Sequence, residues 1–308
     1  MAQKTILIVS NSEDAHADRV LLRLGERGVP VCRLDSDRLI TESHIWRISA
    51  IPGIPSHNSW LIPEVEVVWY RKVYFPEGND PIQSFIRQES EGLLEAILSQ
   101  FRHCRWINPR DRLAQARSKI VQLERAKALG LRIPDTLLTT DQAMLSAFAD
   151  QHGGEIVAKP LQSQVIGMGQ EALVTGTRRL TPEHFAAALT GAPCYAQERL
   201  RINSEVRVIV FGNEVFAMRQ IPDRPADDIK QLPLKSIRHE PCTLEPVLVR
   251  KIHALMASYG LAFGAIDLAI VDEDEPIFLE LNPNGQWLWL QYACGLNLLD
   301  PFIDFLIA

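Results

Sequence analysis

The chain of 308 residues lacks the cysteine pairs that build disulfide frameworks and zinc sites. Its five cysteines are an odd number and none stands at C-x-x-C spacing; they are Cys32, Cys104, Cys194, Cys242 and Cys294. A disulfide scaffold and a zinc ribbon are therefore excluded, and we expect reduced, mostly buried thiols.

Long hydrophobic runs and an excess of positive charge are absent as well. The N-terminal apolar run TILIVS, residues 5–10, is too short for the core of a signal peptide or for a membrane span. The formal net charge of -6 argues against general affinity for the phosphate backbone of nucleic acids. We therefore expect a cytoplasmic protein with no membrane segment and no nucleic-acid partner.

What the chain does have is the length and pattern of several α/β subdomains, because 308 residues exceed what one hydrophobic core usually supports. The pattern predicts an N-terminal parallel α/β domain, a small central α+β lobe and a C-terminal α+β lobe, over residues 1–110, 111–193 and 194–308. The expected helices cover residues 14–27, 78–101, 112–129, 141–152, 181–190 and 244–259. A polar loop is expected over residues 221–242.

Acidic and amide side chains stand at the end of the last two predicted strands. Asp267 lies within the apolar strand AFGAIDLAIV, and Glu280 and Asn282 lie in PIFLELN, after a short acidic turn. In an antiparallel pair, Asp267 falls opposite or close to Glu280, and Asn282 shares the face of Glu280. Three oxygen ligands of this kind suit Mg²⁺, although two solvated rim carboxylates are the simpler alternative.

Phosphates on such a metal require cations from other elements. The candidates are Lys119, Lys159, Arg207 and Arg219, each of which taken alone is more commonly a surface charge. The loop QSQVIGMGQ, residues 162–170, matches neither phosphate-loop motif and fits a mobile flap or an ordinary hairpin equally. The end of the strand in YAQERL could present backbone groups to an adenine edge, with Glu198 or Glu205 reaching the ribose.

Taken in order, these motifs resemble the ATP-grasp superfamily over nearly the whole chain. The motifs are RSKIVQLERAKALGLRIPDT, IVAKP, YAQERL, EVRVIVFG, VFAMRQ, GAIDLAI and FLELNPNGQW. Within the superfamily, WYRK, WINPR and above all ELNPNGQWLWLQYACGL are similar to the maturases of graspetides, the microviridin-type ligases that cyclise a ribosomal precursor peptide.

The resemblance implies ATP and Mg²⁺ as cofactors and a precursor peptide, leader plus core, as partner; it is also compatible with a homodimer. It implies that Asp267, Glu280 and Asn282 bind magnesium. Nucleotide-binding residues would be Lys119, Lys159, Gln197, Glu198, Leu200, Glu205 and Asn282. Catalytic residues would be Arg207, Arg219, Asp228 and Lys230.

The implied reaction activates an Asp or Glu side chain as an acylphosphate, which a Ser or Thr hydroxyl or a Lys amine attacks to give an ω-ester or ω-amide ring. One departure leaves the subgroup open, because Asp228-Ile229-Lys230 stands where microviridin ligases carry Asp-Trp-Arg. Two alternatives remain: a RimK-like ligase that adds amino acids to a small molecule or protein tail, and a nucleotide-binding scaffold with a decayed site.

The peptide partner is expected at two places. Trp69, Tyr70 and Arg71 either face a peptide or form the core of a strand, and the second reading is the commoner one for aromatic residues in a strand. Asn284 and Gln286, beyond the metal-binding strand, are expected to border the acceptor, while Trp287 and Trp289 pack a lid.

Overall fold

The computed structural model describes residues 5–40, 46–47, 57–58, 65–76, 80–161, 165–168, 171–174, 176–189, 191–271 and 275–308. Contacts group the chain into two compact units. The first comprises Met1–Ala114, Leu261–Phe263 and Asn284–Ala308, and the second comprises Gln115–Gly260 and Gly264–Pro283. The division into three regions at 110/111 and 193/194 stays a prediction.

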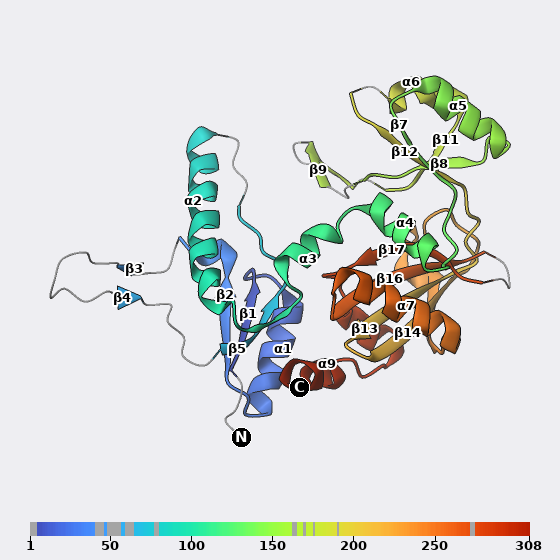
Figure 1. Cartoon of the computed structure of the whole chain (residues 1–308). Helices are drawn as coiled ribbons and strands as arrows, with labels where there is room; N and C mark the ends of the chain where they lie inside the picture. Colours follow the sequence, from blue (N-terminus) through green and yellow to red (C-terminus); the bar gives the residue numbers. More distant parts are fainter. Residues whose placement is uncertain are drawn as a thin grey trace. The chain divides into compact units, whose positions relative to one another are not determined.

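A parallel sheet with strand order β2-β1-β5-β6 organises the first unit. Its strands are β1 (Thr5–Ser10), β2 (Val31–Asp35), β5 (Val65–Tyr70) and β6 (Arg105–Ile107). The other elements are α1 (Ala15–Glu26), α2 (Pro81–Leu98), α3 (Arg110–Gln115), α8 (Leu288–Cys294), α9 (Leu299–Ile307) and the short pair β3 (Trp46–Arg47) and β4 (His57–Asn58). The apolar strands predict a sheet buried on both faces, and α1 and α2 lie on opposite sides of it (Figure 1).

Each face of this sheet has its own apolar layer. Leu7, Val9 and Val68 pack with Leu94 and Leu98 of α2. On the other face, the Trp69 ring lies 4.9 Å from the ring of Phe302 in α9, which also contacts Trp287 and Phe263. Trp69 and Trp287 are fully buried, so both belong to the core of this unit. The core interpretation of Trp69 is therefore confirmed, whereas the expected lid role of Trp287 is not what the structure has, because both rings pack against Phe302 of α9.

His16 fastens the start of α8 in the same unit. Its Nε2 accepts hydrogen bonds from the backbone N–H groups of Trp287 and Leu288, at 3.1 and 2.9 Å. Burial lowers the pKa of His16 to about 3, aided by the Arg71 charge. Since only the neutral ring accepts at this nitrogen, the folded unit requires the unprotonated form.

We predict a pH-dependent loss of stability from this residue. A folded pKa of about 3 lies below the ordinary value of 6.5, so the stabilisation is complete above pH 6.5 and is lost as the pH falls towards 3. The slope is about 1.4 kcal/mol per pH unit. Urea unfolding at pH 7.5 and 5.5 should show a smaller pH effect in His16→Gln than in the natural protein; exposed His103→Gln is the control. An equal pH effect in all three would refute the assignment.

The second unit contains two larger antiparallel sheets. One has the order β11-β8-β12-β7, and the other has the order β15-β14-β13-β16-β17. The strands are β7 (Thr136–Thr139), β8 (Ile156–Ala158), β11 (Arg178–Leu180), β12 (Cys194–Glu198), β13 (Ser204–Phe211), β14 (Glu214–Pro222), β15 (Ile237–Cys242), β16 (Phe263–Ile270) and β17 (Ile277–Asn282), with a separate pair β9 (Val165–Met168) and β10 (Glu171–Val174). The helices are α4 (Lys119–Ala128), α5 (Gln142–Gln151), α6 (Phe185–Ala188) and α7 (Pro246–Tyr259).

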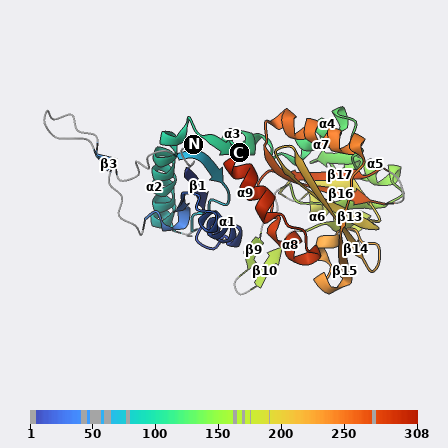
Figure 2. The ribbon, with the colours of Figure 1, turned by 90° about the horizontal axis from the view of Figure 1, so that it is seen from below.

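Helix α4 is held directly on the end of β17. Buried Gln122 accepts from the Leu281 N–H at 2.8 Å and donates to the Leu281 carbonyl at 2.7 Å. Figure 2 shows α4 and α7 together beside β16 and β17. This pairing places Lys119, the first residue of α4, at the same end of the strand as Glu280.

Three predicted elements differ from the structure. The helix expected over 112–129 is split into α3 and α4, because Ser118 caps a new helix by accepting from the Val121 N–H. The loop expected over 221–242 ends in the edge strand β15, which pairs with β14. The helix expected over 181–190 begins as a 3₁₀ turn and is regular only in α6. The acidic turn at 272–274 and most of the 162–170 loop lie outside the described residues.

None of the helices in the described part of the chain combines the length and apolar character that a bilayer span needs.

Candidate functional site

Two carboxylates meet on neighbouring strands of the five-stranded sheet. Asp267 of β16 pairs directly with Glu280 of β17, and Ala265 pairs with Asn282. The prediction that Asp267 lies opposite or close to Glu280 is therefore confirmed. Asp267 is buried, and Glu280 is partly exposed at 30% of its side-chain area. The pair thus has one fixed carboxylate and one that reaches a cavity.

A lysine bridges the two carboxylates. Lys230 Nζ lies 2.8 Å from Asp267 Oδ2 and 2.8 Å from Glu280 Oε1. Arg207 Nη1 donates to the other Asp267 oxygen at 2.5 Å. Burial alone would raise the pKa of Asp267, but the Arg207 and Lys230 charges overcome it and hold that pKa well below its usual range. The two carboxylates in turn raise the pKa of Lys230 against its partial burial.

The donor set fits a divalent cation that keeps some of its waters or substrate oxygens. Within the described residues, no group of three or more His, Cys, Asp or Glu side chains gathers as a metal site. One ammonium nevertheless touches both carboxylates, so a single cation can bridge Asp267 and Glu280. Exposed Asn282 lies on the same face as Glu280, two residues further along β17. Two carboxylates and an amide are ligands that Mg²⁺ accepts.

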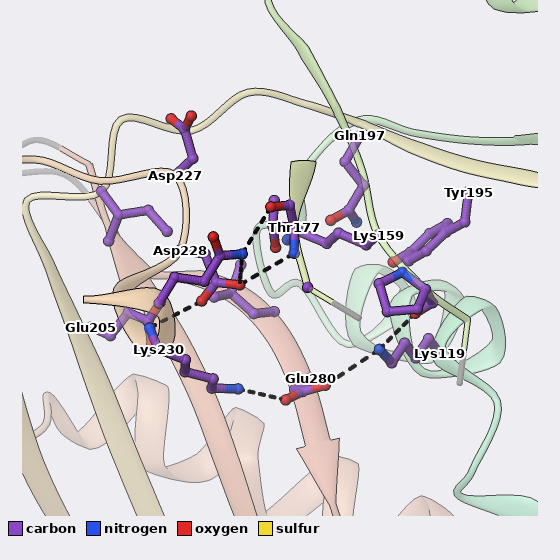
Figure 3. Close-up of a pocket in the computed structure, with 15 residues that line it drawn as sticks. Lys119, Lys159, Thr177, Tyr195, Gln197, Glu205, Asp227, Asp228, Lys230 and Glu280 are labelled. Carbon is purple, nitrogen blue, oxygen red and sulfur yellow. Dashed lines mark hydrogen bonds and ion pairs between the residues drawn. The ribbon is translucent and has the colours of Figure 1, made fainter. Parts of the chain in front are cut away.

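Glu280 borders a cavity of about 270 Å³ within the second unit. Figure 3 shows its lining side chains, with Lys230 and Lys119 on either side of Glu280. Small-molecule sites typically range from about 300 to 1,000 Å³, so this cavity is near the lower limit. The lining residues are Lys119, Lys159, Pro160, Gly176, Thr177, Tyr195, Gln197, Ile202, Glu205, Asp227, Asp228, Lys230, Gln231, Leu279 and Glu280.

Two lysines line the same cavity as Glu280. Lys119 Nζ donates to the Pro160 carbonyl at 2.9 Å and lies 3.9 Å from Glu280 Oε2. Lys159 follows β8 and is held by its backbone N–H, which donates to the Tyr195 carbonyl. Burial lowers the pKa of both lysines, although Glu280 and Asp228 oppose the effect. An anionic ligand in the cavity would pair with both ammonium groups and replace the water that burial removes from them.

Glu205 adds an unusual acid to the same wall. It is buried, and its Oε2 has no hydrogen-bond partner among the described residues. Burial, with the Asp267 charge, raises the pKa of Glu205 to about 7. An unsatisfied buried carboxyl oxygen at a cavity wall is a ready acceptor for a ligand hydroxyl.

A short loop closes one side of the cavity. Gln231 Nε2 donates to the Thr177 carbonyl at 2.8 Å, and Asp228 accepts from the N–H groups of Thr177 and Lys230 at 3.5 and 3.0 Å. Gly176 lies against this contact, since a Cβ there would come within 2.6 Å of Gln231 Nε2. The loop at 227–231 is thereby fastened to the segment before β11 while it presents Lys230 to the acidic pair.

Some predicted residues are not on the cavity wall. Arg219 pairs with Val206, so it projects from the face opposite to Arg207 and is exposed. Glu198 Oε1 accepts from the Asp135 N–H at 2.9 Å. Leu200 packs against the apolar cluster around Ile229. Their implied roles in catalysis and nucleotide binding stay predictions.

Other wall residues were missed by the sequence reading. Tyr195 shares a strand face with Gln197, and burial raises the pKa of its hydroxyl to about 12. The period of two along β12 could have indicated it from Gln197. Thr177, Asp227 and Gln231 lie outside regular strands, where no periodicity could have indicated them.

The fold of the chain is similar to that of known proteins. No protein-family model matches the chain. No curated protein matches it either. Among solved structures, the macrocyclase MdnC of Microcystis aeruginosa MRC, bound with precursor peptide MdnA, superimposes with a TM-score of 0.84 at 25% identity, covering 98% of this chain and 99% of MdnC. The chain has the fold of the ATP-grasp macrocyclases.

Two further ATP-grasp ligases have the same fold as this chain. The RiPP-associated ligase of Chryseobacterium gregarium, in complex with ADP and a leader and core peptide, has a TM-score of 0.82 at 21% identity and covers 99% of this chain and 96% of its own. PsnB, complexed with a variant of its minimal precursor, Mg and ADP, has a TM-score of 0.76 at 20% identity, with coverages of 99% and 98%. The predicted ATP-grasp fold and the resemblance to graspetide maturases are confirmed at the level of the fold.

Proposed function

We propose that this chain is an ATP-dependent carboxylate ligase that closes side-chain-to-side-chain ω-ester or ω-amide rings in a ribosomal precursor peptide. The observation that carries the proposal is the Asp267–Glu280 pair, which Lys230 bridges and whose Glu280 lines one cavity together with Lys119 and Lys159. The structural neighbours bound with precursor peptides, ADP and Mg support it.

The reaction needs activation because a carboxylate is a poor electrophile. Transfer of the γ-phosphoryl group of ATP gives an acylphosphate and ADP, and the hydroxyl or amine then attacks, with release of phosphate. In our proposal Lys119 and Lys159 hold the nucleotide phosphates and Glu205 accepts a ribose hydroxyl. Asp267, Glu280 and Asn282 hold Mg²⁺, which when bound neutralises phosphate charge.

Residues of the chain also set the electrostatics of transfer. Arg207 is held by Asp267, and Lys230, which lines the cavity and has 56% of its side chain exposed, is the candidate for contact with the transferring group. Asp228 holds the turn that carries Lys230. No covalent nucleophile of the protein is required. Cytoplasmic action, with ATP and Mg²⁺ supplied there, and a homodimeric assembly belong to the same proposal.

Mass spectrometry tests the function directly. Purified protein is incubated with ATP, Mg²⁺ and full-length precursor, core alone, or core plus leader in trans. Each ester or amide removes one water from the peptide, so a ladder of water losses with matching ADP release supports ring closure. A mass gain from attached amino acids would instead establish the RimK-like alternative, and no ATP consumption with any peptide would favour the scaffold reading.

We predict that Lys159→Ala weakens ATP binding by about tenfold or more, which corresponds to about 1.4 kcal/mol. The reason is that Lys159 lines the cavity directly after β8, where its backbone N–H donates to the Tyr195 carbonyl. Calorimetric titration with ATP measures the change, and Lys127→Ala on the exposed side of α4 is the control. Equal ATP affinity in Lys159→Ala and the control would remove Lys159 from the site.

A further inference from the structure

The first unit has a second place where ligand chemistry converges, at the carboxyl ends of β1 and β5. The chain passes from β1 to β2 on one side of β1 and later returns to β5 on its other side. In open parallel sheets, the crevice at such a reversal of strand order is where ligands bind. Ser10 ends β1 here, and Arg71 follows β5, with its N–H donating to the Val9 carbonyl.

Arg71 is a buried cation with unused donors. Its side chain is 0% exposed, and its Nε donates to Asp14 Oδ2 at 2.5 Å. Neither Nη1 nor Nη2 has a hydrogen-bond partner among the described residues. Burying such donors without partners is costly, so a native structure that retains them calls for an acceptor from outside.

The surrounding charges leave the site positive. Among the described residues, Asp14 is the one carboxylate that acts on Arg71, and it also accepts a hydrogen bond from the Ser10 hydroxyl at 2.6 Å. His16 is neutral because its Nε2 accepts two N–H groups. Lys72 adds a second cation, whose pKa is lowered by burial and by Arg71. Two cations thus face one carboxylate, and an anion would balance them.

Partly exposed side chains form the margin of this site. The Asn284 amide donates to the Arg71 carbonyl, and the Asn11 amide donates to the Lys72 carbonyl at 2.7 Å. Asn284, Asn11 and Lys72 are all half-buried. These contacts hold the backbone of residues 71 and 72, and the guanidinium itself is fully buried, so a ligand reaches it only by displacing side chains that cover it.

We propose that Arg71 and Lys72 form a carboxylate-binding site, in which the two free Nη groups engage both oxygens and Lys72 adds charge. A planar fork of two donors matches a carboxylate in geometry. The occupant is a carboxylate of an acidic peptide, and only this choice of source rests on the proposed function. Through Asn284, the site adjoins the segment that leaves β17 after the acidic pair.

Nuclear magnetic resonance of arginine guanidinium groups in the full-length protein tests the proposal. The probes are acetyl-glutamate amide for a side-chain carboxylate, acetyl-glutamine for a chain-terminal carboxylate, and acetyl-glutamine amide as the neutral control, at constant ionic strength. We expect a saturable shift of the Arg71 Nη resonances with at least one carboxylate probe and none with the neutral amide. Arg71→Lys identifies the resonance.

Variants separate binding from structure. Lys72→Gln should weaken carboxylate binding at least fivefold, whereas exposed Lys235→Gln should leave it unchanged. Should Arg71→Lys fail to fold, Lys72→Gln decides alone, by the same titration followed through intrinsic tryptophan fluorescence, to which Trp69 contributes with its ring 5.3 Å from the guanidinium carbon. An absence of saturable response to both carboxylates, or an equal response in Lys72→Gln, overturns the site.

The two proposals fail in different ways. Calorimetric ATP binding to Lys72→Gln should equal that of the natural protein, because the nucleotide cavity lies in the second unit. An absence of ATP-dependent water loss from any peptide would reject the macrocyclase function without changing the carboxylate titration.

Discussion

Glu280→Gln is expected to lower ring-closing turnover at least about 100-fold, about 2.7 kcal/mol in barrier, while the fold stays intact. Glutamine keeps the shape and an oxygen that accepts from Lys230, so the contacts of β17 persist. It removes the charge of Glu280, which is the partly exposed carboxylate of the pair, and Mg²⁺ binding depends on charged oxygen ligands. Turnover by mass spectrometry and Mg²⁺ affinity by calorimetry should fall together.

The matched control is Glu275→Gln. Glu275 lies just before the same strand, pairs with Lys251 and is exposed at 47% of its side-chain area, away from the cavity lining. Equal turnover by Glu280→Gln and the control would end the metal assignment. Loss of turnover with undiminished Mg²⁺ affinity would reassign Glu280 to a contact with substrate.

The acidic pair could be predicted from the sequence because its geometry follows from two simple rules. A short turn joins the strands, and side chains alternate with a period of two, so Asp267 had to fall near Glu280. The same rules should have separated Arg207 from Arg219. The hairpin pairs Phe211 with Glu214 across a two-residue turn, which puts Arg219 opposite Val206 and on the other face.

Other parts of the site could not be predicted because they lack periodicity. The cavity is narrowed by contacts of Gln231 and Asp228 with Thr177, all of them in irregular segments brought together only by the packing of two sheets. The edge strand β15 was missed because its sequence IRHEPC contains a proline and has no alternating apolar pattern. Trp287 follows the turn after the acidic strand, which suggests a lid, but its ring packs against Phe302, a contact that no local pattern indicates.

Because Lys230 bridges the two carboxylates, we predict that its removal raises the affinity for Mg²⁺ and lowers turnover. In this structure its ammonium lies where a cation shared by Asp267 and Glu280 would lie, at 2.8 Å from each carboxylate. A lysine and a divalent ion cannot occupy that place together. In our proposal, Mg²⁺ binding at this position would displace Lys230, and the free energy of its two ion pairs would be subtracted from the affinity for the metal.

Lys230→Met removes this competitor and retains the length of the side chain. Mg²⁺ should then bind the nucleotide-free protein at least about tenfold more tightly, about 1.4 kcal/mol, because the Asp267–Glu280 pair has lost its own cation. The melting temperature should fall without metal, since Asp267 keeps only Arg207, and should rise further with Mg²⁺ than in the natural protein. Turnover should nevertheless fall, because the transferring group then lacks contact with the Lys230 ammonium.

The control is Lys235→Met, on an exposed residue of the same segment, which should change none of these quantities. Calorimetric titration with Mg²⁺ and thermal unfolding at several Mg²⁺ concentrations measure the first two effects, and mass spectrometry measures the third. Unchanged or weaker Mg²⁺ binding in Lys230→Met would show that the lysine does not compete for the metal position, and higher turnover would limit its role to blocking the site.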